Sequence, residues 1–367
     1  MKIALILPGG VDRSGTERVI PCLLWLIERL VSGGDEVHVF ALQQEEQPGC
    51  WPLLGARVHN AGRRPRRLRS LGQLFAEHRR GAFDVAHAFW AGGPGAVAAA
   101  FKLLVGVPFA LTLPGGDLVA LPDIGYGGQL NFRGRAWARL ALSLADRVVV
   151  PSERTREQAA ALCIETVRIP LGVALDRWPV AAPRRRHADQ PLRLVHVASL
   201  NRVKDQETLM LAMREVRDRG IDFRLQVIGM DTLDGAVQRR CSQLELDDRV
   251  TFHGFLPHGE TRSWVERSDL MVVSSRHETV PIVQPEAAVA GVPTVGTAVG
   301  QISDWAPHAA VAVPIGDARA LSKAIAELAC DEEERLRLAG AAQALAVAED
   351  ADFTAQQMRT LYVSLCG

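Results

Sequence analysis

Close pairs of cysteines are missing from this sequence. The six cysteines are scattered, none belongs to a Cys-x-x-Cys pair, and no spacing of cysteine and histidine is typical of a zinc site. These absences argue against a disulfide framework and favour a reduced, cytoplasmic setting. The cysteines are Cys22, Cys50, Cys163, Cys241, Cys330 and Cys366.

Long apolar runs are also missing. The longest candidate, residues 91–113, is interrupted by Lys102, Gly106 and Pro108, whereas a membrane-spanning helix needs about 18 or more apolar residues in a row. The first ten residues, "MKIALILPGG", carry one positive charge and an apolar segment that is too short for a signal-peptide core. We expect this segment to be a first strand and the chain not to span a membrane.

The chain has no excess of charge of either sign. Its 42 basic residues balance 42 acidic ones, so no global field would draw it to nucleic acid. Hydrophobic residues make up 48% and charged residues 23%, as in ordinary globular proteins. At 367 residues the chain exceeds the size at which single cores usually stop growing, and two domains are expected.

Short apolar runs alternate with longer helical patterns in the first half of the chain. This alternation is typical of βαβ units stacked into a parallel sheet. A helix is predicted over residues 16–31, ended by the pair Gly33-Gly34. The predicted strands are residues 3–7, 36–40, 84–88, 109–113, 147–151 and 167–170.

A second series of the same kind follows residues 179–191, a stretch rich in Pro, Ala and Arg that we interpret as an interdomain linker. The fold class is therefore α/β, with two Rossmann-like, doubly wound, parallel-sheet domains. Such domains bind ligands at the carboxyl ends of their strands, so a cleft there is expected to hold the site. The strands of the second series are predicted at residues 193–200, 223–229, 249–254, 270–275, 293–297 and 310–314.

Two carboxylates follow the predicted strand 270–275. Glu278 lies in a loop, and Glu286 lies one turn into a helix that is expected to begin at Ile282 and to end near Gly291. The start of a helix attracts anions, and a carboxylate can accept paired hydrogen bonds from a vicinal diol such as a ribose. The alternative is two acids that merely stabilise a helix N-terminus.

The surrounding residues add weight to the first interpretation. Residues 274–295 resemble the E-x7-E motif of family 4 retaining glycosyltransferases, which have the GT-B fold. The resemblance extends over nearly the whole chain. It includes "VDRSGTERVIPCLLWLIERLVSGGDEVHVF", "FDVAHAFWAGGPG", "VRIPLGVALDRWP", "RVTFHGFLP" and "VGTAVGQISDW".

The resemblance implies two domains with distinct tasks. An acceptor-side domain would comprise residues 1–178 plus 353–367, because the last segment resembles the family's terminal helix that crosses back onto the first domain. A nucleotide-sugar-binding domain would comprise residues 192–352.

The resemblance also implies roles for individual residues. Lys204 would contact the donor diphosphate with Arg202 as a second cation, although the family more often has Arg at the position of Ser199. Glu286 would hold the ribose, and Glu278 would reach the transferred sugar. The other implied donor contacts are Gly15 and Thr16 near the phosphates, Leu256 beside the base, and Thr279, Val280, Pro281 and Ile282 along the sugar hydroxyls.

No metal or other cofactor is implied. Fixed cations can stabilise a departing diphosphate without one, and Asp350-Ala351-Asp352, which has the letters of a metal motif, lies in a helical tail where we assign it no role. Catalysis would be front-face displacement, in which the departing phosphate takes the proton of the acceptor hydroxyl.

This sequence departs from the family pattern in several places. Pro114 occupies the position of a histidine, which makes Asp117 our candidate for orienting the acceptor, with a solvated loop aspartate as the equal alternative. His87 is expected to be a core histidine. Three further departures are Thr279 for a glycine after the first glutamate, Gln301 for the second glycine of a pair, and Asp304 for a glutamate.

We therefore expect a cytoplasmic, retaining hexosyltransferase that moves a sugar from a UDP- or GDP-linked donor to an acceptor hydroxyl in polysaccharide or glycolipid biosynthesis. A nucleotide-sugar epimerase of the same fold and a non-catalytic nucleotide-sugar binder are the alternatives. We interpret the basic stretch at residues 63–69 as part of a solvated helix face. The alternative is contact with an anionic membrane surface.

Overall fold

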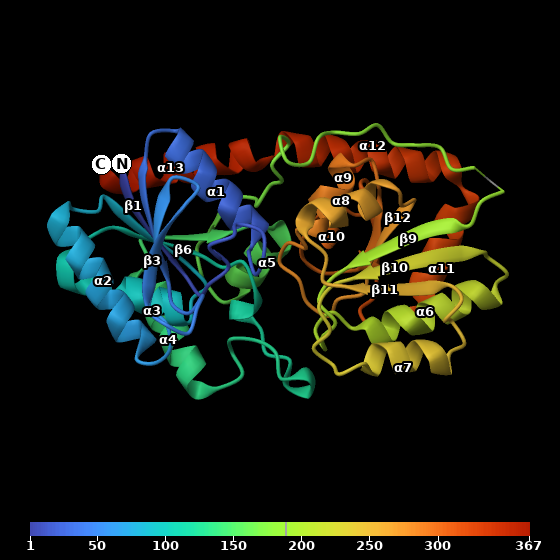
Figure 1. The fold of residues 1–367 in the computed structure, drawn as a ribbon, viewed down its shortest axis with the longest axis horizontal. Coiled ribbons are helices and arrows are strands. Elements are labelled where there is room, and N and C mark those ends of the chain that lie inside the picture. Colours follow the sequence, from blue (N-terminus) through green and yellow to red (C-terminus); the bar gives the residue numbers. More distant parts are fainter. Residues whose placement is uncertain (188) are drawn as a thin grey trace. The chain divides into compact units, whose positions relative to one another are not determined.

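The computed structural model describes residues 1–187 and 189–367. The chain forms two compact units, the first comprising Met1–Ala174 and Glu349–Gly367 and the second Leu175–Ala348 (Figure 1). Each unit is an α/β domain with its own sheet and core. The predicted fold class is confirmed.

The sheet of the first unit has the strand order β3-β4-β2-β1-β5-β6-β7-β8. All neighbours pair in parallel except β3 and β4, which form an antiparallel hairpin at the edge. The strand order reverses between β1 and β5, so a topological switch point lies where these two strands end. The strands are β1 (Lys2–Leu7), β2 (Glu36–Ala41), β3 (Gly49–Leu53), β4 (Ala56–Asn60), β5 (Val85–Phe89), β6 (Phe109–Thr112), β7 (Arg147–Val150) and β8 (Val167–Arg168).

The hairpin of β3 and β4 was not predicted. Its turn residues Leu54 and Gly55 both have positive φ, at 51° and 79°, as a two-residue hairpin turn of type I′ requires. Leucine is an unusual choice for that position, and Pro52 lies within the edge strand. The usual sequence signals of a hairpin are therefore absent.

Helices cover both faces of this sheet. Figure 1 shows α1 and α13 on one face and α2 and α3 on the other. The helix predicted over residues 16–31 begins later, at Pro21, because proline is preorganised for a first helical turn and the residues before it form turns. The helices are α1 (Pro21–Ser32), α2 (Arg66–Arg80), α3 (Gly93–Val105), α4 (Phe132–Leu144), α5 (Glu153–Ala161) and α13 (Ala351–Cys366), with short 3-10 helices η1 (Gly116–Leu118) and η2 (Pro122–Ile124).

The C-terminal helix α13 packs on the first unit, as predicted. His87 in β5 is fully buried, and its two ring nitrogens lie 2.6 Å from the hydroxyl of Tyr362 and 2.7 Å from that of Thr112. The hydroxyl of Thr354 accepts the Gly172 N–H and donates to the carbonyl of Pro170. His87 is thus a core histidine with both nitrogens satisfied, as expected.

The second unit has a six-stranded parallel sheet in the order β11-β10-β9-β12-β13-β14. The order reverses between β9 and β12, which places a switch point at the ends of these strands. The strands are β9 (Leu192–Val197), β10 (Phe223–Ile228), β11 (Val250–Gly254), β12 (Leu270–Val273), β13 (Thr294–Thr297) and β14 (Ala310–Val313). The helices are α6 (Gln206–Asp218), α7 (Ala236–Gln243), α8 (His258–Glu266), α9 (Val283–Val289), α10 (Gly300–Trp305), α11 (Ala318–Cys330) and α12 (Glu332–Ala348).

Among the described residues, every helix is too short or too polar to cross a membrane.

Candidate functional site

The switch point of the second unit is formed by the loops that follow β9 and β12. In the first loop, the side-chain oxygen of Asn201 accepts the backbone N–H groups of Val203 and Lys204. The hydroxyl of Ser274, directly after β12, donates to the carbonyl oxygen of Lys204 at 2.8 Å. These bonds fix the backbone of Lys204 at the end of the sheet where ligands are expected.

Lys204 and Glu278 meet at this switch point. The ammonium of Lys204 forms an ion pair with Oε1 of Glu278, and the hydroxyl of Ser275 donates to the same oxygen at 2.6 Å. The exposed fraction is 25% for the Lys204 side chain and 11% for that of Glu278. The structure therefore brings together two of the predicted site residues, which come from different loops.

Glu286 lies in α9 and is 3% exposed. Its Oε1 shares a hydrogen bond of 2.7 Å with Nε2 of His258, the first residue of α8, and the indole N–H of Trp178 donates to the same imidazole. Burial raises the pKa of Glu286, while the bond to His258 opposes that rise. His258 was missed by the sequence analysis, since no local pattern indicates its contact with Glu286.

The loop between Glu278 and α9 is compact. Thr279, Val280 and Pro281 are buried, and the carbonyl oxygen of Thr279 accepts the N–H of Gln301. A Cβ atom added at Gly300 would lie 2.2 Å from that carbonyl oxygen, so only glycine permits this approach. Thr279, which replaces a family glycine, is not among the described residues with positive φ, so its Cβ causes no strain.

The helix after this loop, α9, starts within one residue of the predicted start. Ile282 is its N-cap residue, and Gly291, with φ of 73°, follows its last turn. Two further predicted residues belong to the same unit: Leu256 lies partly buried between β11 and α8, and Arg202 is exposed in the loop that carries Lys204.

A second switch point lies in the first unit, where β1 ends. The side-chain oxygen of Gln44, after β2, accepts the N–H groups of Gly10 and Val11 at 2.6 and 3.0 Å. Gly15 has φ of 67° and closes a turn with Asp12, and the Thr16 N–H donates to the Ser14 hydroxyl at 3.2 Å. Gln44, which no motif indicated, therefore shapes the loop that carries Gly15 and Thr16.

Asp117 lies in η1, near the ends of β5 and β6, and is 7% exposed. Its Oδ1 accepts the N–H of Ala91 at 2.8 Å, whereas its buried Oδ2 has no hydrogen-bond partner among the described residues. Burial raises its pKa to about 6. Close by, a Cβ atom at Gly115 would lie 2.7 Å from the indole of Trp90, whose φ of 73° is unusual for an aromatic residue.

These features of Asp117 and Trp90 are typical of a functional site. Asp117 was predicted from the sequence as a solvated or acceptor-orienting residue, and the structure shows that it is buried. Trp90 was missed, since backbone strain leaves no signal in the sequence.

Two family models match the chain. The model described as "Glycosyl transferase 4-like domain" matches residues 19–172, and "Glycosyl transferases group 1" matches residues 181–345. Together they cover most of both units.

Curated relatives and solved structures agree with these matches. The 2-deoxystreptamine N-acetyl-D-glucosaminyltransferase of Streptomyces fradiae is 30% identical over 260 residues, which is 65% of this chain and 60% of that protein. The putative colanic acid biosynthesis glycosyltransferase WcaL of Escherichia coli is 28% identical over 42% of this chain and 40% of its own length. The matched segments thus span about half the length of these relatives.

The whole fold recurs in solved structures. Sucrose-phosphate synthase from Thermosynechococcus elongatus superposes with a TM-score of 0.84 at 22% identity, covering 100% of this chain and 99% of that one. Anabaena HepE in complex with UDP-glucose gives a TM-score of 0.76 at 18% identity, covering 99% and 100%. These likenesses show the two-domain GT-B fold. The first half of the chain matches the 4-like model and the second half the group 1 model, so this protein belongs to the glycosyl transferase family that these two models describe.

Proposed function

We propose that this protein is a retaining glycosyltransferase that moves a sugar from a nucleoside-diphosphate sugar to an acceptor hydroxyl. The observation that carries the proposal is the ion pair of Lys204 and Glu278 at the switch point of the second unit, followed in the same motif by the buried Glu286. The cation suits the negative charge of a diphosphate, and the two carboxylates suit the hydroxyl groups of a sugar and a ribose, which donate hydrogen bonds.

The proposed donor contacts follow from this arrangement. Lys204, with the exposed Arg202 as a second cation, binds the diphosphate. Glu278 accepts hydrogen bonds from the sugar hydroxyls, and Glu286 accepts them from the ribose. UDP is the nucleotide that the HepE complexes favour, with GDP as the alternative. The remaining proposed contacts are Gly15, Thr16, Leu256, Thr279, Val280, Pro281 and Ile282.

Donor binding would exchange contacts that the structure already shows. In the structure, Lys204 forms an ion pair with Glu278, and His258 shares a hydrogen bond with Glu286. When the diphosphate arrives, the ammonium of Lys204 turns to it, and Glu278 is released to the sugar hydroxyls. In the same way the ribose diol replaces His258 at Glu286. Both carboxylates are therefore held by protein partners before the donor arrives, and hydroxyl groups of the donor take over these hydrogen bonds when it binds.

The proposed reaction is a front-face displacement. The bond between the anomeric carbon and the diphosphate oxygen breaks, that oxygen takes the proton of the acceptor hydroxyl, and the hydroxyl oxygen bonds to the anomeric carbon on the same face. Lys204 stabilises the charge that develops on the diphosphate. Because side chains supply this charge, the proposed mechanism requires no metal ion. The second unit is thus assigned to the donor and the first to the acceptor.

A donor panel tests the proposal. The protein is incubated with UDP- and GDP-linked sugars, and thermal stability and released nucleoside diphosphate are measured, since binding raises apparent stability. A stabilising donor that is slowly hydrolysed, or transferred once an acceptor is added, supports transfer. An epimerised donor would instead support the epimerase, and stabilisation without turnover under any acceptor would support the non-catalytic binder.

Asp117 is proposed to orient the acceptor hydroxyl through Oδ2, the oxygen that has no partner within residues 1–187 and 189–367. Because Oδ1 already accepts the Ala91 N–H, the proton of the neutral acid would lie on Oδ2, and the ionised form is the stronger acceptor there. Because its pKa is about 6, kcat/KM should rise with pH through about 6, and Asp117→Asn should lower turnover and remove that inflection. Asp123→Asn, in the neighbouring η2, is the control that should keep the profile. An unchanged pH profile in Asp117→Asn would contradict the role.

The raised pKa of Asp117 also predicts how the stability of the protein depends on pH. An aspartate whose folded-state pKa is raised keeps its proton between about pH 4 and 6, where the unfolded chain has lost it. The free energy of unfolding of the wild type should therefore fall, relative to Asp117→Asn, by about 3 kcal/mol as pH rises through this window. Urea unfolding at pH 4 and pH 7 measures the difference.

Contact with a membrane surface is proposed for the first unit. The guanidinium of Arg67 in α2 lies 5.0 Å from the ring centre of Trp137 in α4, and on the same two helices Leu68 is 71% and Phe132 75% exposed. Basic and large apolar side chains on adjacent helices suit an anionic lipid surface.

Vesicle binding measures this contact. Co-sedimentation is expected with anionic vesicles and not with neutral ones, and it should weaken as salt screens the charges. Phe132→Ser should reduce it, whereas Leu345→Ser, at an exposed position of α12 in the second unit, should not. Equal binding to neutral vesicles would refute an electrostatic surface contact.

A further inference from the structure

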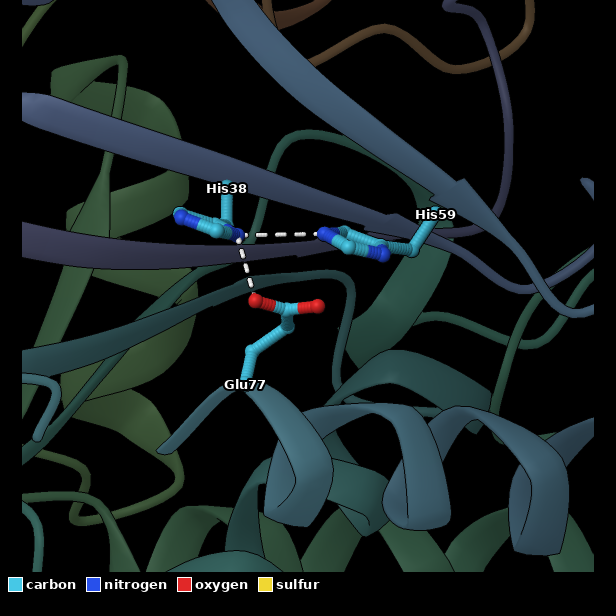
Figure 2. Close-up of side chains that lie close together, drawn as sticks. All are labelled: His38, His59 and Glu77. Carbon is cyan, nitrogen blue, oxygen red and sulfur yellow. Dashed lines mark hydrogen bonds and ion pairs between the residues drawn. The ribbon is translucent and has the colours of Figure 1, made fainter. Parts of the chain in front are cut away.

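Three buried side chains in the first unit, none of which the proposed function uses, converge on one another. His38 comes from β2, His59 from β4 and Glu77 from α2, and Figure 2 shows the three pointing toward one another. Their exposed fractions are 5%, 6% and 6%. One ligand atom from each lies within 4.8 Å of the others. Buried groups of this kind need partners.

We propose that His38, His59 and Glu77 form a binding site for Zn²⁺. Nδ1 of His38 lies 3.1 Å from Nε2 of His59 and 3.9 Å from Oε2 of Glu77. Zinc bonds of 2.0–2.1 Å in a tetrahedral arrangement place ligand atoms about 3.3 Å apart. The two distances bracket this value, so small side-chain rotations would bring all three atoms onto one ion.

The atoms that surround the three ligands already orient them. Nε2 of His38 shares a hydrogen bond of 2.9 Å with Glu36, which leaves Nδ1 directed at the other two ligands. Arg80 pairs with Oε1 of Glu77 and leaves Oε2 on the side of His38. A histidine ligand held by a carboxylate on its other nitrogen is the usual outer support of a zinc site.

Aromatic rings pack against the two histidines of the cluster. Phe40 stacks on His59 with ring centres 4.7 Å apart, and Phe83 meets His38 edge-on at 5.5 Å. These rings limit the access of water, which strengthens interactions with an ion.

The donor set selects the kind of ion. Two imidazoles and one carboxylate suit Zn²⁺ and related transition metals, whereas Ca²⁺ and Mg²⁺ prefer oxygen ligands throughout. An ion bound here would tie two strands to the helix that covers them. His59 also precedes Asn60, whose amide holds the backbone of residues 44–47, so the ion would stiffen the loop that carries Gln44.

Zinc binding to the 367-residue chain, first stripped of metal with a chelator, tests the proposal. Dialysis against Zn²⁺ with a competing chelator should give one tightly bound ion for the wild type and for His308→Gln, which removes an exposed histidine of the second unit. His59→Gln and Glu77→Gln should lose this ion. Glu36→Gln changes a side chain that is 61% exposed, so the fold should survive, and affinity should fall by about 10–100-fold.

Two outcomes would overturn the proposal: a wild type that binds zinc no more tightly than His59→Gln, or a Glu36→Gln variant with wild-type affinity. If the ligand variants fail to fold, anomalous diffraction from wild-type crystals grown with zinc decides the matter. A peak between the three side chains supports the site, and bound zinc found only elsewhere refutes it. The readouts are independent of transferase activity, so the result stands whatever the outcome of the donor panel.

Discussion

Lys204→Ala is expected to lower the turnover of the preferred donor by about 10²–10³-fold, the usual effect of removing one preorganised group that stabilises developing charge. Negative charge develops on the diphosphate as the glycosidic bond breaks, and Lys204 is the cation that the structure holds in place by its backbone and by its pair with Glu278. Single-turnover release of nucleoside diphosphate, at saturating donor, measures the effect.

Lys323→Ala is the matched control, since this lysine is 69% exposed on α11 of the same unit. It should keep wild-type turnover. Removing Lys204 also leaves Glu278 without its cation, so Lys204→Ala/Glu278→Gln is compared with Glu278→Gln alone: the charge on the diphosphate remains unstabilised in the double variant, and its turnover should stay far below that of Glu278→Gln. Equal turnover of these two variants would mean that Lys204 only compensates Glu278, and its proposed role in the chemistry would be wrong.

The sequence predicted the elements that carry the site because strand periodicity and loop composition are local signals. All twelve predicted strands are present, and α9 begins at Val283, one residue after the predicted start. The antiparallel hairpin of β3 and β4 was missed because its turn uses Leu54 where Asn or Asp is usual.

Contacts between distant segments were harder to predict. The contact of Lys204 with Glu278 was expected only from the family resemblance. It depends on the strand order, which brings the ends of β9 and β12 together and which local sequence patterns do not specify. His258 was missed because its contact with Glu286 depends on how α8 packs beside α9. The cluster of His38, His59 and Glu77 was missed for the same reason, as β2 and β4 become neighbours although β3 separates them in sequence.

Glu286→Gln is expected to weaken nucleotide binding by about 10–100-fold. The carboxylate accepts hydrogen bonds from two ribose hydroxyls in the proposed complex, and bonds to a charged group are worth about 1.5–3 kcal/mol. The amide can accept with one oxygen only. Titration calorimetry with the nucleoside diphosphate of the preferred donor measures the loss, and Glu260→Gln, an exposed glutamate in α8, is the control.

The free nucleoside separates the roles of Glu286 and Lys204. It contains the ribose and lacks the diphosphate, so Glu286→Gln should weaken its binding as strongly as that of the diphosphate, whereas Lys204→Ala should leave its binding unchanged. If Glu286→Gln impaired the diphosphate alone, the carboxylate would not hold the ribose, and the loss would have to come from a displaced α9 or from the freed His258. Glu286→Gln should weaken binding of the free nucleoside and Lys204→Ala should not. A general loss of folding would weaken this binding in both variants, so it cannot produce the expected result.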